Sequence, residues 1–254
     1  MDIQISNLTK NWKSKTLFDS INVDISKHQI TSLIGPNGCG KTTLFNLISG
    51  QDLNFSGEIK FDEFDLKKFR NQIRYRISLV LDFDNLDLNL TGKEFVNFVI
   101  GMYKNENISI SNIQSKIVKL SEIFDMTSSL DQSILNYSHG MIKKIQLIAY
   151  LSCPFEILIM DEPFNGLDSE SSISLQKILL GLQKKTILIS SHNLEIVQKI
   201  SDKIIILHNT KIKFSGKPEE LSKLYNERDL NDSWLEVLGI ENKLNKINEL
   251  LEII

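Results

Sequence analysis

Residues 35–43 read Gly-Pro-Asn-Gly-Cys-Gly-Lys-Thr-Thr and match the pattern G-x-x-x-x-G-K-[ST] of a phosphate-binding loop. Glycines allow successive backbone N–H groups to converge on an anion, and a helix that follows directs the positive end of its dipole to the same point. We expect Lys41 to reach the β- and γ-phosphates of ATP, and the Thr42 hydroxyl to ligate Mg²⁺. The predicted nucleotide-binding residues are Gly35, Pro36, Asn37, Gly38, Cys39, Gly40, Lys41, Thr42 and Thr43.

A second motif follows the apolar run 157–160, where the chain continues with Asp161 and Glu162. The run predicts a buried strand that delivers two carboxylates to its carboxyl end. We expect Asp161 to hold Mg²⁺, usually through water, and Glu162 to orient or deprotonate an attacking water. Such a run is more often a strand that meets a polar loop, but a phosphate loop 120 residues before Asp161 favours the catalytic interpretation.

The elements around these motifs are those of an alternating α/β fold. A strand is predicted at 30–34, directly before the loop, and helical spacing follows the loop, so a chance match of a glycine-rich turn is the weaker interpretation. Strands that alternate with helices pair in parallel and place functional loops at their carboxyl ends. The other predicted strands lie at 21–25, 59–61, 157–160, 186–189 and 203–207, and the later helices at 171–184 and 193–200.

The middle of the chain, residues 88–153, has helical periodicity and no convincing strand. Thr91 and Glu94 predict a capping box at the start of its first helix. Two more helices are expected, one from Ile113 to Phe124 and one from near Gly140. The apolar face predicted for the first helix consists of Phe95, Phe98, Val99 and Met102.

Composition places few limits on function. The chain has 254 residues, 41% hydrophobic and 24% charged, with a net charge of -3, which does not favour nucleic acid as a partner. The only cysteines, Cys39 and Cys153, suggest a reducing compartment rather than a disulfide framework. We find no signal peptide and no apolar run long enough to span a bilayer, so a membrane role would need a partner.

Together the two motifs resemble those of the ATP-binding subunits of ATP-binding cassette (ABC) transporters, over about residues 1–216. That family adds a signature, usually Leu-Ser-Gly-Gly-Gln, at the start of a helix between the motifs. Here residues 137–141 read Tyr-Ser-His-Gly-Met, a variant that resembles the branch with separate export-type permeases. The resemblance implies that Ser138 and Gly140 bind the γ-phosphate of ATP on the opposite subunit, although a Ser-His-Gly run is more often only a helix N-cap.

Three further positions are similar to the family. Residues 165–168, Asn-Gly-Leu-Asp, resemble its D-loop, which implies that Asp168 lies at the partner subunit near the nucleotide. His192 resembles the switch histidine that contacts the γ-phosphate, although a lone histidine after a strand is usually a surface residue. Trp12, 29 residues before Lys41, is placed like the aromatic ring that stacks on adenine, and its alternative is an exposed ring in a loop.

One position departs from the family. Where its members carry a glutamine that contacts Mg²⁺ and water, this chain has Asp82. A carboxylate can still face Mg²⁺, but it is shorter than glutamine and adds charge. We therefore include Asp82 with Thr42 and Asp161 as a candidate metal-binding residue.

The resemblance implies an α/β fold with a P-loop NTPase (RecA-like) core, an antiparallel β subdomain and an inserted α-helical subdomain. The expected domains are the ATPase at 1–216, with its insert at about 88–153, and a C-terminal helical extension at 217–254. The implied function is ATP hydrolysis, with ATP and Mg²⁺ as cofactors and Lys41, Glu162 and His192 as catalytic residues. Two subunits, as a homodimer or with a second ABC ATPase, would drive export through an integral-membrane permease at the cytoplasmic face of the cell membrane.

Two other classes of function are compatible with these motifs. One is an ABC ATPase that acts on ribosomes or DNA, but such relatives usually carry two cassettes or long coiled coils, and this chain is acidic. The other is a regulatory module that binds nucleotide without turnover, and the presence of Glu162 and His192 speaks against it. The thiol of Cys39 lies near Lys41 and a predicted helix N-terminus, so we also consider a lowered pKa for it; the alternative is an inert thiol that packs inward.

Overall fold

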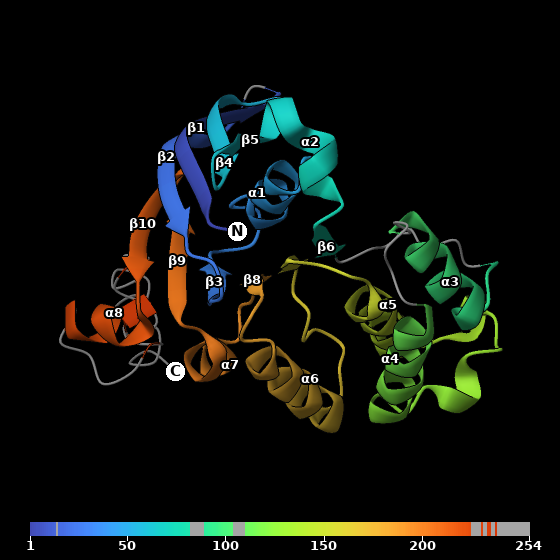
Figure 1. Ribbon diagram of the computed structural model, residues 1–254. Coiled ribbons are helices and arrows are strands. Elements are labelled where there is room, and N and C mark those ends of the chain that lie inside the picture. The colour runs from blue at the N-terminus through green and yellow to red at the C-terminus, as the bar shows by residue number, and fades with distance from the viewer. Residues whose placement is uncertain are drawn as a thin grey trace, which may run out of the picture.

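The computed structural model describes residues 1–13, 15–81, 89–103 and 110–224, together with 230, 233, 234 and 237. Two β-sheets and the helices between and around them form the core, and three helices lie to one side (Figure 1). In chain order the elements are β1 (Ile3–Trp12), β2 (Lys15–Ile25), β3 (Ile30–Ile34), α1 (Lys41–Ile48), β4 (Ser56–Phe61), β5 (Phe64–Asp65), α2 (Leu66–Arg74), β6 (Ile77–Val80), α3 (Gly92–Met102), α4 (Ile110–Ile123), the 3₁₀ turns η1 (Thr127–Ser129) and η2 (Ile134–Asn136), α5 (His139–Ser152), β7 (Ile157–Met160), α6 (Ser169–Gly181), β8 (Thr186–Ser190), α7 (Leu194–Ile200), β9 (Lys203–His208), β10 (Lys211–Gly216) and α8 (Pro218–Leu224).

The larger sheet has the strand order β10-β9-β3-β8-β7-β6, and all its pairs are parallel except β9 with β10. Strands β3, β7 and β8 are buried along their whole length, as expected for apolar strands with helices on both faces. Because β8 lies between β3 and β7, the loops after all three strands emerge at one edge of the sheet. The alternating α/β arrangement predicted from the sequence is confirmed.

The smaller sheet, β2-β1-β4-β5, is antiparallel. Residues of β1, β2 and β4 share one buried cluster with Leu44 and Leu47 of α1 and with Leu188 and Ile205 of the larger sheet. Helix α1 is therefore packed between the two sheets, which fixes the loop that precedes it (Figure 1). On the other face of the larger sheet, α6 packs through Leu175 and Leu179, which lie in a second cluster with residues of β7 and β8.

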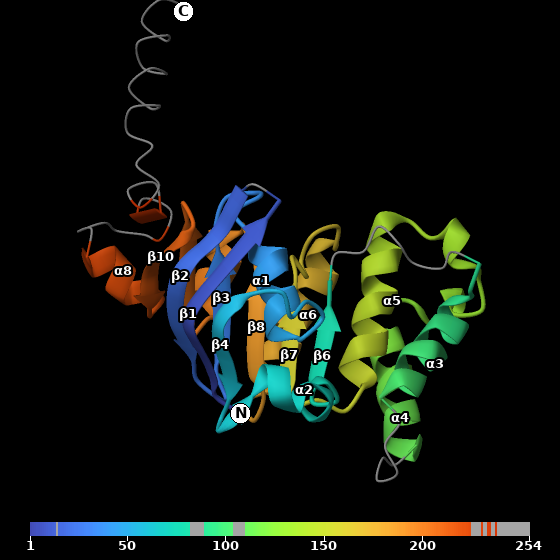
Figure 2. The same ribbon diagram turned by 90° about the horizontal axis from the view of Figure 1, so that it is seen from above.

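Helices α3, α4 and α5 gather beside β6 at one side of the larger sheet (Figure 2). The predicted capping box is present: Glu94 N donates to Thr91 Oγ1 at 3.2 Å, and Thr91 N donates to Glu94 Oε2 at 2.8 Å. The predicted helices from Ile113 and from near Gly140 correspond to α4 and α5, and the described residues of 88–153 form no strand, only an isolated β-bridge between Thr91 and Ser133.

The predicted apolar face of α3 is partly wrong. Phe95 and Val99 are buried, but Phe98 and Met102 are 61% and 46% exposed, and Val96 is buried instead. Each helical residue turns the side chain by about 100°, so a face that includes both Phe95 and Val96 is centred between them and leaves Phe98 on its margin. The contacts of α3 are mostly with α5, and because a single helix covers only a narrow stripe of the α3 surface, Phe98 and Met102 remain exposed.

At the other end of the molecule, β9, α7 and α8 enclose a third cluster around Ile204, Val197 and Leu221. Helix α8 begins at Pro218, inside the predicted helical extension 217–254, and Leu230 and Trp234 pack against the same cluster. Residues 238–254 of this extension lie outside the described residues. Within the part of the chain that the structure describes, no helix is both long and apolar enough to cross a membrane.

Candidate functional site

The loop 35–43 connects β3 to α1 and has a backbone that requires glycine. Gly38 and Gly40 adopt φ values of 76° and 110°, which side chains other than glycine rarely adopt. A Cβ on Gly40 would also lie 2.8 Å from the ring of Phe18. Gly40 is the N-cap of α1 and offers no side-chain acceptor to the first turn, so backbone N–H groups at this helix start remain for an anion.

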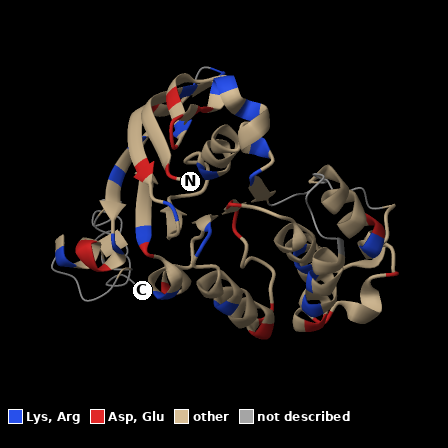
Figure 3. Cartoon of the chain, in the orientation of Figure 1, with Lys and Arg blue, Asp and Glu red and all other residues tan. Residues whose placement is uncertain are grey.

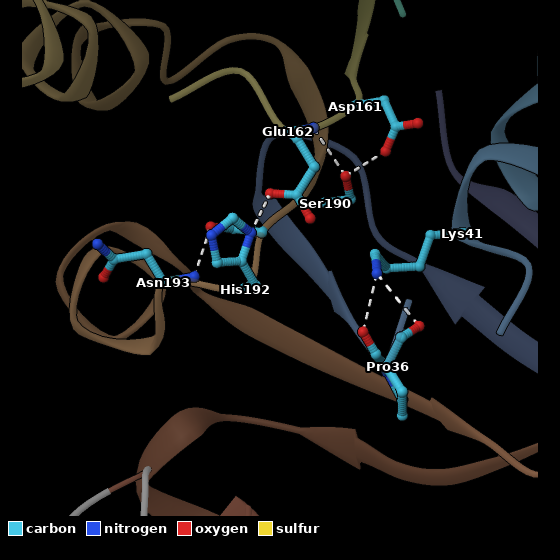
Figure 4. A network of polar contacts seen from close by, with 9 residues as sticks. Pro36, Lys41, Asp161, Glu162, Ser190, His192 and Asn193 are labelled. Carbon is cyan, nitrogen blue, oxygen red and sulfur yellow. Dashed lines mark hydrogen bonds and ion pairs between the residues drawn. The ribbon is translucent and has the colours of Figure 1, made fainter. Parts of the chain in front are cut away.

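Lys41 lies inside this loop and is only 8% exposed. Its ammonium donates to the carbonyl oxygens of Gly35 at 2.8 Å and Pro36 at 3.5 Å (Figure 4). Among the described residues no carboxylate forms an ion pair with it. A buried cation that is held only by neutral carbonyls is compensated best by an anionic ligand, so the loop fits a phosphate.

Asp161 follows β7 at the same edge of the sheet and is 4% exposed. Its carboxylate accepts two hydrogen bonds, one from the Thr42 hydroxyl at the start of α1 and one from the Ser190 hydroxyl at the end of β8. The predicted metal residues Thr42 and Asp161 are thus in direct contact, although they are 119 positions apart in the chain.

Ser190 links Asp161 to Glu162. The backbone N–H of Glu162 donates to Ser190 Oγ at 2.8 Å, and Glu162 itself has a φ of 45°, which is rare for a residue with a side chain (Figure 4). Strained backbone of this kind is maintained only where neighbouring contacts hold it, and it is frequent at active sites. The sequence reasoning did not assign a role to Ser190. A polar residue directly after the apolar run of β8 was the available signal, but only the strand order shows that it borders β7.

Glu162 and His192 face each other at the outer side of this network. Glu162 Oε2 lies 3.0 Å from His192 Nδ1, and the side chains are 14% and 64% exposed. Asn193, next in the chain, caps α7 by accepting from Ile196 N at 3.1 Å and donates its own N–H to Ser191 Oγ at 3.1 Å. The turn that carries His192 is therefore fixed at both sides, and the imidazole points at the carboxylate (Figure 4).

The signature residues form a separate group at the starts of α5 and α6. Ser138 is the N-cap of α5 and accepts from Met141 N at 3.2 Å. Gly140 lies against Gly166, since a Cβ on Gly140 would be 2.7 Å from the Gly166 carbonyl oxygen. Asp168 caps α6 and pairs with Lys144 of α5 at 2.7 Å. Among the described residues, no hydrogen bond or ion pair joins this group to the phosphate loop.

Asp168 is held as a carboxylate by its neighbours. The Lys144 ammonium and then the Ser171 backbone N–H, which donates at 2.8 Å, hold the pKa of Asp168 well below its usual range. The side chain is still 53% exposed, so a second molecule can reach it. The structure thus shows Ser138 in the capping role that the alternative interpretation gave it, and Asp168 in a capping role that the sequence analysis did not consider.

Comparison with known proteins decides the family. A family model described as ABC transporter matches residues 18–165. An ABC transporter ATP-binding protein of Clostridium acetobutylicum is 32% identical over 206 residues, which cover 79% of this chain and 73% of that protein. The chain belongs to the ABC transporter ATP-binding family. Members of this family bind and hydrolyse ATP.

Other ABC proteins agree with this assignment. The sulfate/thiosulfate import ATP-binding protein CysA of Pseudomonas aeruginosa is 30% identical over 254 residues, 98% of this chain and 75% of that protein. An ATP-binding cassette solved as a dimer in a post-hydrolysis state with ADP and Pi superposes with a TM-score of 0.75 at 21% identity, over 85% of this chain and 98% of that one, and supports the fold. Names among the relatives include importers and a Nod factor exporter, so the export-type branch is not confirmed.

The remaining predicted residues have different outcomes. Trp12 ends β1 in a hairpin with Lys15 and is 58% exposed, so its ring is available to a ligand. The prediction of a lowered pKa for Cys39 is wrong: burial raises the pKa of the thiol, and the nearby Lys41 offsets this only in part. Cys39 packs inward, where a Cβ on Gly35 would lie 2.5 Å from its sulfur. Asp82 lies outside the described residues.

Proposed function

We propose that this ABC transporter ATP-binding subunit hydrolyses ATP in a head-to-tail dimer and thereby drives a substrate through a separate membrane permease. The observation that carries the proposal is the continuous network Thr42–Asp161–Ser190–Glu162–His192, which joins the phosphate loop to a carboxylate and an imidazole. A module that only binds nucleotide has no need of the last two groups. The coupling to transport rests on the names of the relatives.

The inner half of the network is suited to binding phosphate and a cation. Lys41 and the glycine loop bind and orient the β- and γ-phosphates. The contact of Thr42 Oγ1 with Asp161 shows that one hydroxyl and one carboxylate oxygen share a small volume, which suits Mg²⁺, an ion that takes few protein oxygens and completes its shell with water and phosphate. Among the described residues no three acidic, His or Cys side chains gather as a metal site. Bound there, Mg²⁺ would neutralise developing charge on the phosphates.

The outer half is suited to positioning a water molecule. Glu162 presents a partly buried carboxylate that can accept a proton, and Ser190 fixes the backbone that carries it. His192 orients that carboxylate and offers its other ring nitrogen to the γ-phosphate. Glu162 is thus the proposed base or water-orienting residue, and His192 its partner.

The second group of residues supports the dimer. Ser138, Gly140 and Asp168 lie together, yet none is bonded to the chain's own phosphate loop, so we assign them to the nucleotide of the opposite subunit. A distant relative of the same fold has been solved as a dimer, and the exposed carboxylate of Asp168 is accessible to such a partner. The two subunits are identical or belong to two different ABC ATPases. Trp12, at its exposed hairpin end, is the proposed surface for adenine.

We propose the domain limits 1–216 for the ATPase, with a helical insert at about 88–153, and 217–254 for a C-terminal extension. The chain would act at the inner face of the cell membrane, attached through an integral-membrane permease. Export is the proposed direction and rests on the Tyr-Ser-x-Gly-Met signature alone. Transport assays in inverted vesicles with the permease distinguish the two directions, because an exporter would load these vesicles on addition of ATP and an importer would not.

A role on ribosomes or DNA is not favoured. The net charge is -3, and Lys, Arg, Asp and Glu are interspersed over both sheets and most helices (Figure 3). A protein that follows a nucleic-acid backbone concentrates Lys and Arg on one face.

The decisive experiment compares Glu162→Gln with wild type. The variant keeps the shape of the site but loses the proton acceptor, so we expect ATP to bind with unchanged affinity and turnover to fall by about 10²- to 10⁴-fold. Glu122→Gln, an exposed carboxylate on α4, is the matched control and should hydrolyse ATP like wild type. Wild-type turnover in Glu162→Gln would remove Glu162 from the proposed chemistry.

A further inference from the structure

A cavity lies at the edge of the larger sheet opposite to the phosphate-loop network, where β6, β7 and β8 begin. Its volume is about 600 Å³, within the range of small-molecule sites. Three of its lining residues, Arg76, Glu156 and Lys185, each directly precede one of these strands. The nucleotide network follows the carboxyl ends of β7 and β8. The four residues of β7 span roughly 13 Å, so the cavity is a site of its own.

One side of the cavity is strongly basic. Helix α4 contributes Lys116 and Lys119, and among the described residues neither has a carboxylate partner. Lys185 donates to the Phe155 carbonyl and lies 5.4 Å above the Phe155 ring. The pKa of Lys116 is lowered, first by partial burial and then by the positive charge of Lys185.

The anions of the cavity do not balance these cations. The only described carboxylate in its lining is Glu156, and it already pairs with Arg76 at 3.5 Å. Three lysines therefore line the cavity, of which Lys116 and Lys119 are exposed, and among the described residues none of the three forms an ion pair with a carboxylate. An anionic ligand would remove the repulsion between Lys116 and Lys185.

The other wall is apolar. Leu151 and Phe155 are 6% and 7% exposed, and Leu120, Ile178 and Leu182 are half-buried around them. Water forms no hydrogen bonds with these apolar side chains, whereas a hydrocarbon chain that packs against them is transferred out of water, which is favourable. An inorganic anion would leave this wall unused.

We propose that the cavity binds a small amphipathic organic anion, with its carboxylate toward Lys116, Lys119 and Lys185 and its hydrocarbon body against Leu120, Ile178 and Leu182. A free carboxylic acid with an alkyl chain has both features. Such a ligand contacts α4 of the helical region and α6 of the core at once. Its binding requires no ATP and does not depend on the proposed transport function.

The test is calorimetric titration of the nucleotide-free full-length protein with decanoate below its micelle concentration. We expect saturable binding of one decanoate per chain, and much weaker binding of decanol and of acetate, which lack the charge and the hydrocarbon body respectively. Decanol that binds as tightly as decanoate, or titrations without saturation, would overturn the proposal.

Paired variants locate the bound anion. Lys116→Gln/Lys119→Gln should weaken decanoate binding by about tenfold or more, because two charged contacts are lost. Lys177→Gln, an exposed lysine on α6 outside the cavity, should bind like wild type. Leu182→Glu, which adds an anion to the apolar wall, should abolish binding, with circular dichroism confirming the fold. Equal affinities in wild type and the double lysine variant would place decanoate elsewhere and refute the site.

Discussion

The phosphate-loop network and the signature group (Ser138, Gly140 and Asp168) differ in how their polar side chains are hydrogen-bonded within one chain. In the first, Thr42, Asp161, Ser190, Glu162 and His192 form one connected chain of hydrogen bonds across three strand ends. In the second, Ser138 and Asp168 only cap their own helices, and Asp168 also pairs with Lys144. We therefore propose that the first group holds a ligand by itself, whereas the second stabilises its helices and offers exposed atoms to another molecule.

Among the variants that test this difference, Lys41→Ala should have the largest effect, which is on ATP affinity. It removes the buried cation of the loop, and we expect ATP affinity to fall by about 10²-fold or more, since charged hydrogen bonds to two phosphates are lost. Equilibrium binding of a fluorescent ATP analogue measures this. Lys177→Ala on the exposed face of α6 is the control, and comparable ATP affinity in both variants would contradict the role of Lys41.

Ser138→Arg should separate the two groups. We expect ATP to bind the variant's own loop with wild-type affinity, while hydrolysis falls by about 10²-fold, because the bulky cation blocks the opposite nucleotide. Ser128→Arg, an exposed serine of η1, is the control. Mixing Ser138→Arg with Lys41→Ala should restore at most one composite site per dimer. Full activity of Ser138→Arg alone would argue against the head-to-tail dimer.

Ser190→Ala tests the connection between the two carboxylates. Loss of its hydroxyl leaves Asp161 and the Glu162 N–H without a shared partner, so we expect turnover to fall by about 10- to 100-fold with a smaller change in ATP affinity. Steady-state kinetics on Ser190→Ala and on Ser115→Ala, an exposed serine of α4, provide the comparison. A change in KM with unaltered kcat would assign Ser190 to binding rather than to positioning Glu162.

The smallest expected effect is that of the Asp168 charge on the free energy of unfolding. Because Lys144 and Ser171 lower the pKa of Asp168 in the folded chain, its charge stabilises the fold above the unfolded value of 3.8, and this contribution is lost as the pH falls through the lower folded value. Asp168→Ala, which also removes the helix cap, should cost about 1 kcal/mol at pH 7, and Asp168→Asn, which can still cap, should cost less.

Denaturant unfolding at pH 7 and between pH 5 and 2 measures the contributions of the Asp168 charge and of its helix cap to the free energy of unfolding. The difference between wild type and Asp168→Asn should shrink toward low pH. A difference that grows as the pH falls would show that the carboxylate of Asp168 destabilises the fold.

The sequence alone predicted the alternating α/β arrangement and the helical middle of the chain, and it located the phosphate loop and the two carboxylates after β7. Glycine spacing specified the phosphate loop, because only glycine tolerates the backbone of Gly38 and Gly40. Short-range patterns were similarly reliable: the capping box at Thr91 and the strand predicted at 21–25 depend on residues a few positions apart, although β2 already begins at Lys15. The position of Asp161 after a buried strand followed from the apolar run that precedes it.

Other features required the tertiary structure, because they depend on which elements are neighbours. Ser190 became a site residue only because β8 lies between β3 and β7. Phe98 is exposed because α3 has its main contacts with one helix, and periodicity cannot show how wide a covered face is. The inward packing of Cys39, which raises its pKa, and the basic cavity between α4 and α6 likewise arise from contacts between residues far apart in the chain.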